Sequence, residues 1–145
     1  MLADMFSRCF FGVFGVAKSN GAGCGGALRF EGGHIRALFS GPVLNYGADF
    51  VTLFAVKVAL EVLLEAKWSE DVVLVMELES QVVLNWLSSP LTRPRKWWDY
   101  FEELDKLMSR SNNIHFKLVP KGVNSMAVSL ATLDIQRNEV LKAWW

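Results

Sequence analysis

Two glutamates, Glu77 and Glu79, stand at the end of "VVLVMELES", residues 72–80, an apolar run of strand length. They are two residues apart, so in a strand they share one face. Carboxylates at the carboxyl end of a buried strand are frequent ligands of divalent metals in α/β proteins. A solvated strand end also explains the pair, and both interpretations stay open.

The elements before this segment are expected to be three strands and a helix. Residues 9–17 have strand character, and the glycine-rich "KSNGAGCGG" follows as a turn. "GALRF" and "HIRALFSG" then form a hairpin around a Gly-containing loop. From Ala48 to Lys67 the apolar residues change to helical spacing. The chain therefore opens with an antiparallel sheet that leads into a long helix.

The elements after the glutamates alternate between helices and strands. Ser80 is placed to cap a short helix that runs through Leu87. "WWDYFEELDKLMSR" predicts an amphipathic helix, "NNIHFKLVP" a fifth strand, and the segment from Asn124 to Trp145 a closing helix. This order predicts one α/β domain over residues 1–145, with helices on both faces of a mixed sheet.

Composition limits the classes of function. The 145 residues are 52% hydrophobic, which excludes a disordered chain, and 15 basic residues balance 15 acidic ones. The balance removes the argument for nucleic-acid binding through a strong net positive field. Cys9 and Cys24 could form one bridge but are more typical of buried thiols in a reducing compartment. No CxxC or Cys/His cluster indicates zinc.

The apolar start "CFFGVFGVA" could be the core of a signal peptide or a first buried strand. It is far shorter than the roughly 20 residues that span a bilayer. We expect the strand, and with it a soluble, intracellular protein. His34 and His115 are expected to be structural residues of their strands.

Several short motifs occur in a recognisable order: "NGAGCGGALR", "VTLFAVKVAL", "ELESQ", "VPKGVNSMAVSLA" and a final "AWW". Together they resemble the ribonuclease H-like domains of plants that derive from retrotransposons of the non-LTR reverse transcriptase type. The resemblance implies a three-layer α/β/α fold with a five-stranded mixed sheet of order 3-2-1-4-5. It also implies four carboxylates that hold two divalent metals and cut the RNA strand of an RNA–DNA hybrid.

The resemblance places those four acids at Gly15, Thr52, Glu79 and Val128. Only Glu79 carries a carboxylate, and Asp49 lies one helical turn before Thr52. Because Mg²⁺ is bound mainly through carboxylates and water, a site with one or two acids should hold it weakly. We therefore expect no metal cofactor and a catalytically degenerate domain.

Candidate nucleic-acid contacts lie in three segments. "TRPRKWW" combines Arg93, Arg95 and Lys96 with Trp97, which suits phosphate contact and base stacking. The acidic "DYFEELD" that follows favours instead a loop with one core and one surface tryptophan. The resemblance adds contacts in the glycine-rich turn and before the last helix, although a plain turn and a helix cap explain those residues as well: Lys18, Asn20, Lys121 and Asn124.

The terminal Trp144 and Trp145 either fold back over the sheet or anchor a protein partner. The leading hypothesis is a non-catalytic binding module for a protein, or weakly for a nucleic acid. The alternative is a weak Mg²⁺-dependent nuclease for RNA–DNA hybrids, using Glu79 with Asp49 or Glu77. A retroelement relic with no selected role is a third possibility.

Overall fold

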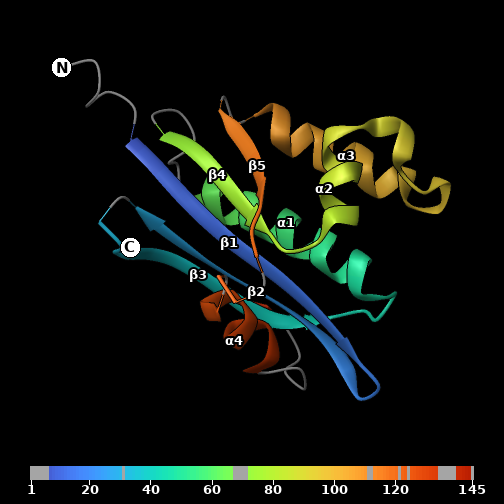
Figure 1. Cartoon of the computed structure of the whole chain (residues 1–145), viewed down its shortest axis with the longest axis horizontal. Helices are drawn as coiled ribbons and strands as arrows, with labels where there is room; N and C mark the ends of the chain where they lie inside the picture. The colour runs from blue at the N-terminus through green and yellow to red at the C-terminus, as the bar shows by residue number, and fades with distance from the viewer. Residues whose placement is uncertain are drawn as a thin grey trace.

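The computed structural model describes residues 7–30, 32–66, 72–110, 113–120, 122–123, 125–133 and 140–144. Its strands are β1 (Ser7–Lys18), β2 (Gly21–Phe30), β3 (Ile35–Val43), β4 (Val72–Leu78), β5 (Ile114–Leu118) and β6 (Leu141–Trp144). Its α-helices are α1 (Ala48–Glu65), α2 (Gln81–Ser88), α3 (Trp98–Ser109) and α4 (Ser125–Leu133). Two short 3₁₀ turns, Pro90–Thr92 and Arg95–Trp97, join α2 to α3 (Figure 1).

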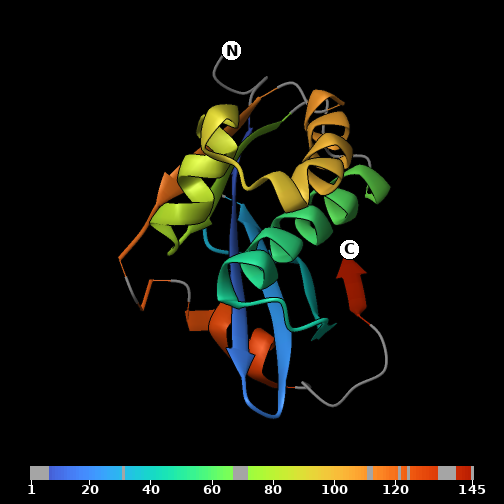
Figure 2. The same cartoon turned by 90° about the vertical axis from the view of Figure 1, so that its right-hand side faces the viewer.

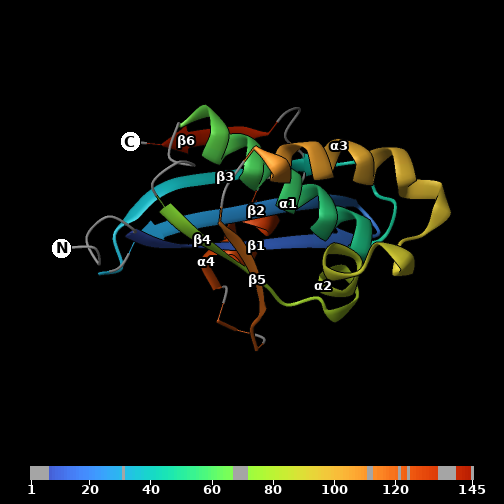
Figure 3. The same cartoon turned by 90° about the horizontal axis from the view of Figure 1, so that it is seen from above.

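The strands form one mixed sheet of order β5-β4-β1-β2-β3-β6. β1, β2 and β3 are antiparallel neighbours, whereas β4 pairs parallel with both β1 and β5. The predicted order 3-2-1-4-5 is therefore confirmed. α1 and α3 lie on one side of this sheet and α4 on the other, which gives three layers (Figure 3).

The closing helix is shorter than predicted. α4 ends at Leu133, and the last described residues form a sixth strand, β6, which pairs antiparallel with β3 (Figure 2). Of the two alternatives for the terminal tryptophans, folding back over the sheet is wrong for Trp144, because Trp144 extends the sheet opposite Ala37. Lys142 stabilises this edge through ion pairs with Glu61 and Glu65 of α1.

The main core lies between the sheet and α1. Alternate residues of β1 and β4, among them Phe11, Leu74 and Met76, are fully or almost fully buried against the apolar side of α1. α4 packs on the opposite face, where a Cβ at Gly25 would overlap the α4 backbone. The hydroxyl of Ser40 in β3 donates to the Leu130 carbonyl of α4. The glycine-rich β2 thus lets a helix approach the sheet closely.

Candidate functional site

A cavity of about 260 Å³ opens where β4 ends and β1 continues. We call it the strand-end pocket. Its lining comes from β1, from the first turn and a half of α1 and from the residues after β4: Val13, Phe14, Gly15, Ala48, Asp49, Thr52, Glu79 and Ser80. Three of the four positions expected from the sequence, Gly15, Thr52 and Glu79, are therefore brought together. Val128, on α4, does not line the cavity.

Two carboxylates face this pocket. Ser80 caps α2, as predicted, because its Oγ accepts from the Val83 amide at 3.1 Å. The same Oγ lies 3.4 Å from Oδ1 of Asp49, to which it donates, so Asp49 is linked to the start of α2. Glu79 is half-buried, and its Oε2 is buried without a hydrogen-bond partner among the described residues. Among the described residues, Asp49 and Glu79 are the acids that line the pocket.

Gly15 can carry no side chain in this structure. A Cβ there would overlap the α1 backbone at Val51 and Thr52, so an aspartate at position 15 would have no room. Because successive residues of a strand point to opposite faces, the preceding residue, Phe14, points away from α1. Phe14 also lines the strand-end pocket. Position 14 is therefore the place on β1 from which a carboxylate could reach this cavity.

The donor set does not fit a pair of Mg²⁺ ions. Thr52 contributes a neutral hydroxyl and is 7% exposed, and Phe14 contributes an apolar ring. Within the described ranges, no three side chains of Asp, Glu, His or Cys come close enough together to hold a metal ion. Two dications held near one another need more anionic oxygen than Asp49 and Glu79 supply.

Glu77 belongs to a different environment from Glu79. It is only 4% exposed, and its Oε1 lies 2.8 Å from Nη1 of Arg29 in β2. It is neither a solvated strand end nor part of the strand-end pocket. The two sequence interpretations of the Glu77–Glu79 pair are thus both wrong for Glu77, whereas Glu79 remains a pocket residue.

An aromatic platform lies beside the strand-end pocket, made of Tyr46, Phe50, Trp97 and Tyr100. The ring centroids of Phe50 and Trp97 are 4.3 Å apart, and Tyr46 lies 5.5 Å from each of them. Burial, with the nearby carboxylate of Glu61, raises the pKa of the Tyr100 hydroxyl, which stays protonated. Phe50 follows Asp49 in α1, so the platform and the pocket share one stretch of helix.

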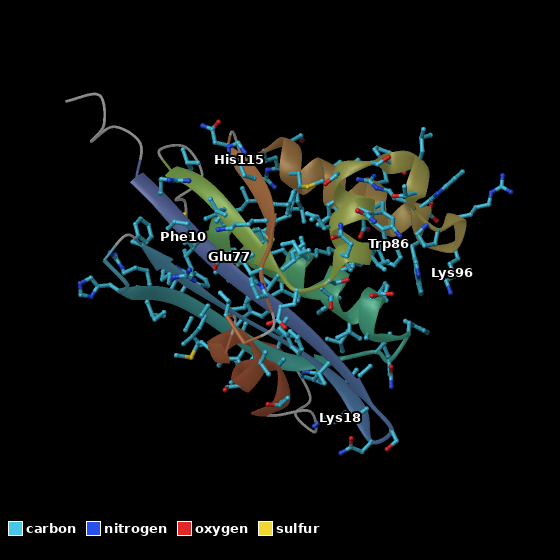
Figure 4. The ribbon with its side chains drawn as sticks, in the orientation of Figure 1. Phe10, Lys18, Glu77, Trp86, Lys96 and His115 are labelled. Carbon is cyan, nitrogen blue, oxygen red and sulfur yellow. The ribbon has the colours of Figure 1, made fainter. Side chains whose placement is uncertain are left out.

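One basic group, Lys96, lies over this platform, and a second, Arg95, lies over the neighbouring Trp98. Lys96 Nζ is 5.3 Å from the Trp97 ring centroid, and the Arg95 guanidinium is 5.3 Å from that of Trp98. Both cations are exposed, and Lys96 extends from the end of the molecule in Figure 4. The expected loop with one core and one surface tryptophan is nearly what forms, since Trp97 is half-buried and Trp98 is 53% exposed.

Arg93 was expected to contact nucleic acid, but its guanidinium is bound within the protein. Its guanidinium makes a bidentate ion pair with Asp105, at 2.8 and 3.1 Å, and its Nε donates to the Trp86 carbonyl at 2.7 Å. It also stacks over Phe101, and only 7% of its side chain is exposed. Arg93 fastens the α2–α3 connection and has no free donor face for a phosphate.

The turn between β1 and β2 lies at the same end of the strands as the strand-end pocket. Lys18 and Asn20 are exposed, and the Lys18 carbonyl accepts from Nδ2 of Asn45 at 3.1 Å. Asn45 also accepts from the Gly47 amide at 3.3 Å, which fixes the loop that carries Tyr46. Lys18, Tyr46 and the strand-end pocket therefore lie along one continuous edge.

Sequence reasoning missed Asn45, Tyr46 and Phe50. Phe50 and Tyr46 were available as aromatic residues next to the start of α1, but their contact with Trp97 joins segments about fifty residues apart, which no local pattern indicates. Lys121, Asn124 and Trp145 lie outside the described residues. Trp144 is 41% exposed on β6, and its role as a protein anchor stays a prediction.

None of the helices in the described part of the chain is long and apolar enough to cross a membrane. An intracellular location and a plant origin stay predictions. No curated protein shows significant similarity to this chain.

Solved ribonucleases H share this architecture. LC11-RNase H1, in complex with an RNA/DNA hybrid, superposes with a TM-score of 0.76 at 18% identity, over 86% of this chain and 94% of that one. RNase H1 of the halophilic archaeon Halobacterium salinarum gives 0.76 at 18% identity, over 90% and 96%. A foamy viral protease-reverse transcriptase, also with an RNA/DNA hybrid, gives 0.70 at 15% identity, over 90% of this chain and 20% of that one.

The family model described as "Reverse transcriptase-like" matches residues 10–133, a range that includes β2 to β5, all four helices and most of β1. The chain therefore has the ribonuclease H-like fold and belongs to the reverse transcriptase-like family.

Proposed function

We propose that this domain binds nucleic acid, with an RNA–DNA hybrid as the first substrate class to test, and does not cut it. The observation that carries the proposal is the composition of the strand-end pocket. It lies at the junction of β1, α1 and β4 but holds two carboxylates, Asp49 and Glu79, beside the neutral Thr52 and the ring of Phe14. Related structures contain RNA/DNA hybrids, which supports the choice of ligand.

The binding surface in this proposal is the edge that runs from the β1–β2 turn to the aromatic platform. Lys18, Arg95 and Lys96 supply positive charge for phosphates. Tyr46, 56% exposed, and Trp97 supply ring faces for stacking. The acids of α3 lie on the following helix, and two of them are neutralised: Glu103 by Lys57 at 2.9 Å and Asp105 by Arg93. The expected repulsion from "DYFEELD" is therefore reduced.

In this proposal catalysis is lost because residues without a carboxylate stand at three of the four positions where the resemblance implies an acid. On β1 the acid position would be Phe14 instead of Gly15, since position 15 has no room for a side chain. On α1 it would be Thr52, and on α4 Val128. A pocket with so few anionic ligands cannot hold two dications close together tightly enough for phosphodiester cleavage.

The second candidate is a weak metal-dependent nuclease, and one observation favours it. Glu79 has a buried oxygen with no hydrogen-bond partner among the described residues, and it faces the same cavity as Asp49. A single cation between these two carboxylates would satisfy that oxygen. Glu77, considered as a partner of Glu79, is held by Arg29 and is dropped from this candidate.

Binding is tested by fluorescence anisotropy with a labelled RNA–DNA hybrid over a salt series. We expect Lys96→Ala and Trp97→Ala each to weaken binding by about three- to tenfold, in line with about 1 kcal/mol for one phosphate or stacking contact. Lys106→Ala is the matched control, since Lys106 lies on α3 and pairs with Glu102. Affinity that is independent of salt, or equal losses for Lys106→Ala, would contradict the proposed surface.

A further inference from the structure

The sheet carries a second charged surface, on the side of α4 and away from the aromatic platform. β5 ends the sheet beside β4, and α4 covers β1, β2 and β3, so none of the described helices covers the α4 side of β4 and β5 (Figure 3). The register places His115, Val75, Phe10 and Arg29 in one row across β5, β4, β1 and β2. Figure 4 labels Phe10, Glu77 and His115 on these strands.

We define the basic sheet face as Arg8, Phe10, Arg29, His115 and Lys117. Arg8 lies one pleat from Phe10 on β1, and Lys117 one pleat from His115 on β5, so all five side chains share the α4 side. Arg8, His115 and Lys117 are exposed, and Arg29 is 36% exposed. His115, expected to be structural, is thus a surface residue of this face.

The charge of this face is one-sided. Arg8, Arg29 and Lys117 give three positive charges, and the one acid that the described residues of β1, β4 and β5 place on this side is Glu77, which is buried and paired with Arg29. These four side chains therefore leave a net of two positive charges on the face. The arginines are also ordered by the ring of Phe10, whose centroid lies 5.9 Å from the Arg8 guanidinium and 5.1 Å from that of Arg29.

The acids gather on the other side of the molecule. α3 carries four of them within one helix, and α1 carries two more that point toward β6: Asp99, Glu102, Glu103, Asp105, Glu61 and Glu65. Bases of the same side pair with most of these acids: Lys57 with Glu103, Arg93 with Asp105, and Lys142 with Glu61 and Glu65. The helical side is therefore mixed in charge, whereas the basic sheet face holds one acid among the described residues of its strands. A partner that meets the basic sheet face must be anionic to gain from this arrangement.

A cavity of about 290 Å³ adjoins the basic sheet face, between the sheet and the start of α4. Arg29 forms its charged wall, and the remaining lining is aliphatic or small: Gly12, Ala27, Ile35, Val123, Met126 and Ala127. Val123 and Met126 are 51% and 50% exposed, so apolar side chains that face solvent surround the mouth. Gly12 and two alanines leave space that larger residues would fill.

We propose that this face docks an acidic protein segment, with one aliphatic side chain of that segment in the cavity and its carboxylates against Arg8, Arg29 and Lys117. The lining decides between a peptide and a nucleic acid. Aliphatic groups and a flexible methionine suit an aliphatic side chain, whereas a base is held by stacking on exposed aromatic planes. The described lining of the cavity holds no aromatic ring, and the nearby Phe10 is half-buried beside Arg8 and Arg29. The proposal is independent of nucleic-acid binding at the aromatic platform.

The probe for this proposal is a fluorescein-labelled peptide of sequence Glu-Asp-Leu-Glu-Asp-Leu-Glu-Asp, titrated with the whole chain. Two matched peptides replace either the leucines by glycine or the acids by their amides. We expect saturable binding of the first peptide and at least about tenfold weaker binding of each matched peptide, because one class of contact is then lost.

Three protein variants locate the site. Arg8→Glu/Lys117→Glu reverses the charge of the face, and Val123→Glu puts a carboxylate at the cavity mouth; each should weaken peptide binding by at least about tenfold. Lys106→Glu, a reversal on the helical side, should leave it unchanged. Circular dichroism of each variant checks that it is folded, and Val123→Glu acts at an exposed position where folding is not at risk.

Three results would overturn the proposal. The first is that the wild-type protein shows no saturable binding of the acidic peptide. The second is that Lys106→Glu weakens peptide binding as much as the face variants do. The third is that a single-stranded oligonucleotide displaces the peptide and that its own binding falls with Arg8→Glu/Lys117→Glu. The last result would assign the basic sheet face to nucleic acid. Hybrid binding at the other edge is measured separately, so either proposal can fail alone.

Discussion

Glu77 of β4 lies 2.8 Å from the guanidinium of Arg29 in β2, diagonally across β1, where Gly12 is opposite Glu77 and Phe10 is opposite Arg29. The absence of a side chain at Gly12 lets an ion pair span three strands. The pair removes Glu77 from the catalytic candidates and at the same time shapes the basic sheet face. Glu77, which the sequence offered as a candidate metal ligand, therefore has a structural role.

Arg29→Met should destabilise the protein more than Glu77→Gln. The first change leaves a carboxylate that is 4% exposed without its guanidinium, at a cost of about 3 kcal/mol, whereas the second leaves a partly exposed arginine, at a cost of about 1 kcal/mol. Urea unfolding measures both free energies. Lys106→Met, in the exposed pair with Glu102, is the control and should change stability by less than about 0.5 kcal/mol. Equal, small effects at all three sites would show that the pair is not buried as described.

Positions 14 and 15 should respond in opposite ways to an aspartate. Gly15→Asp forces atoms into the α1 backbone and should cost about 1–3 kcal/mol or more. Phe14→Asp faces the strand-end pocket and should be tolerated better. Phe14→Asp/Thr52→Glu, together with Asp49 and Glu79, would place four acids in the cavity, and the melting temperature of this variant should rise with Mn²⁺ while that of the wild type stays unchanged. A stable Gly15→Asp protein that gains Mn²⁺ binding would return the first acid position to Gly15.

Cys9 and Cys24 should make the fold sensitive to alkaline pH. Burial raises the pKa of both thiols from 9.0 to about 12. The folded state therefore holds these protons more tightly than the unfolded state, so the stabilisation is complete below about pH 9 and is lost as pH rises toward 12. Urea midpoints at about pH 8 and about pH 10.5 measure the loss.

The double variant Cys9→Ala/Cys24→Ala is the control for the alkaline loss. This variant should retain only the part of the alkaline loss of stability that is due to Tyr100, whose pKa is also raised by burial. In the wild type, both thiols should also react slowly with a disulfide reagent until urea is added. Fast labelling of the native protein would contradict their burial.

Strand and helix positions could be predicted because they depend on local periodicity, whereas the strand order was implied by the family resemblance. β4 reads as a continuous apolar run since it lies between β1 and β5, and Ser80 was recognisable as a cap from its place before α2. β6 could not be predicted, because four residues with apolar spacing fit a helix as well as a strand. Its pairing with β3 and the ion pairs of Lys142 decide between them.

The site could be predicted only in part, because it too depends on contacts between segments far apart in the sequence. Gly15, Thr52 and Glu79 were located together through the family resemblance. Which residue of β1 can point a side chain into the cavity depends on the side of the sheet that each residue faces and on how closely α1 packs against β1, and neither can be read from the sequence. Arg93 looked like a phosphate contact among basic neighbours. Its partner, Asp105, lies on the next helix, and no local pattern indicates that pair.

The most direct test of the account is the fate of a labelled RNA–DNA hybrid incubated with the wild-type protein and Mg²⁺ or Mn²⁺. Native and denaturing gels of the same samples separate binding from cutting. The account predicts a retarded complex whose RNA strand stays intact in both metals. Metal-dependent RNA fragments that disappear with Glu79→Ala or Asp49→Ala would contradict it and establish the nuclease.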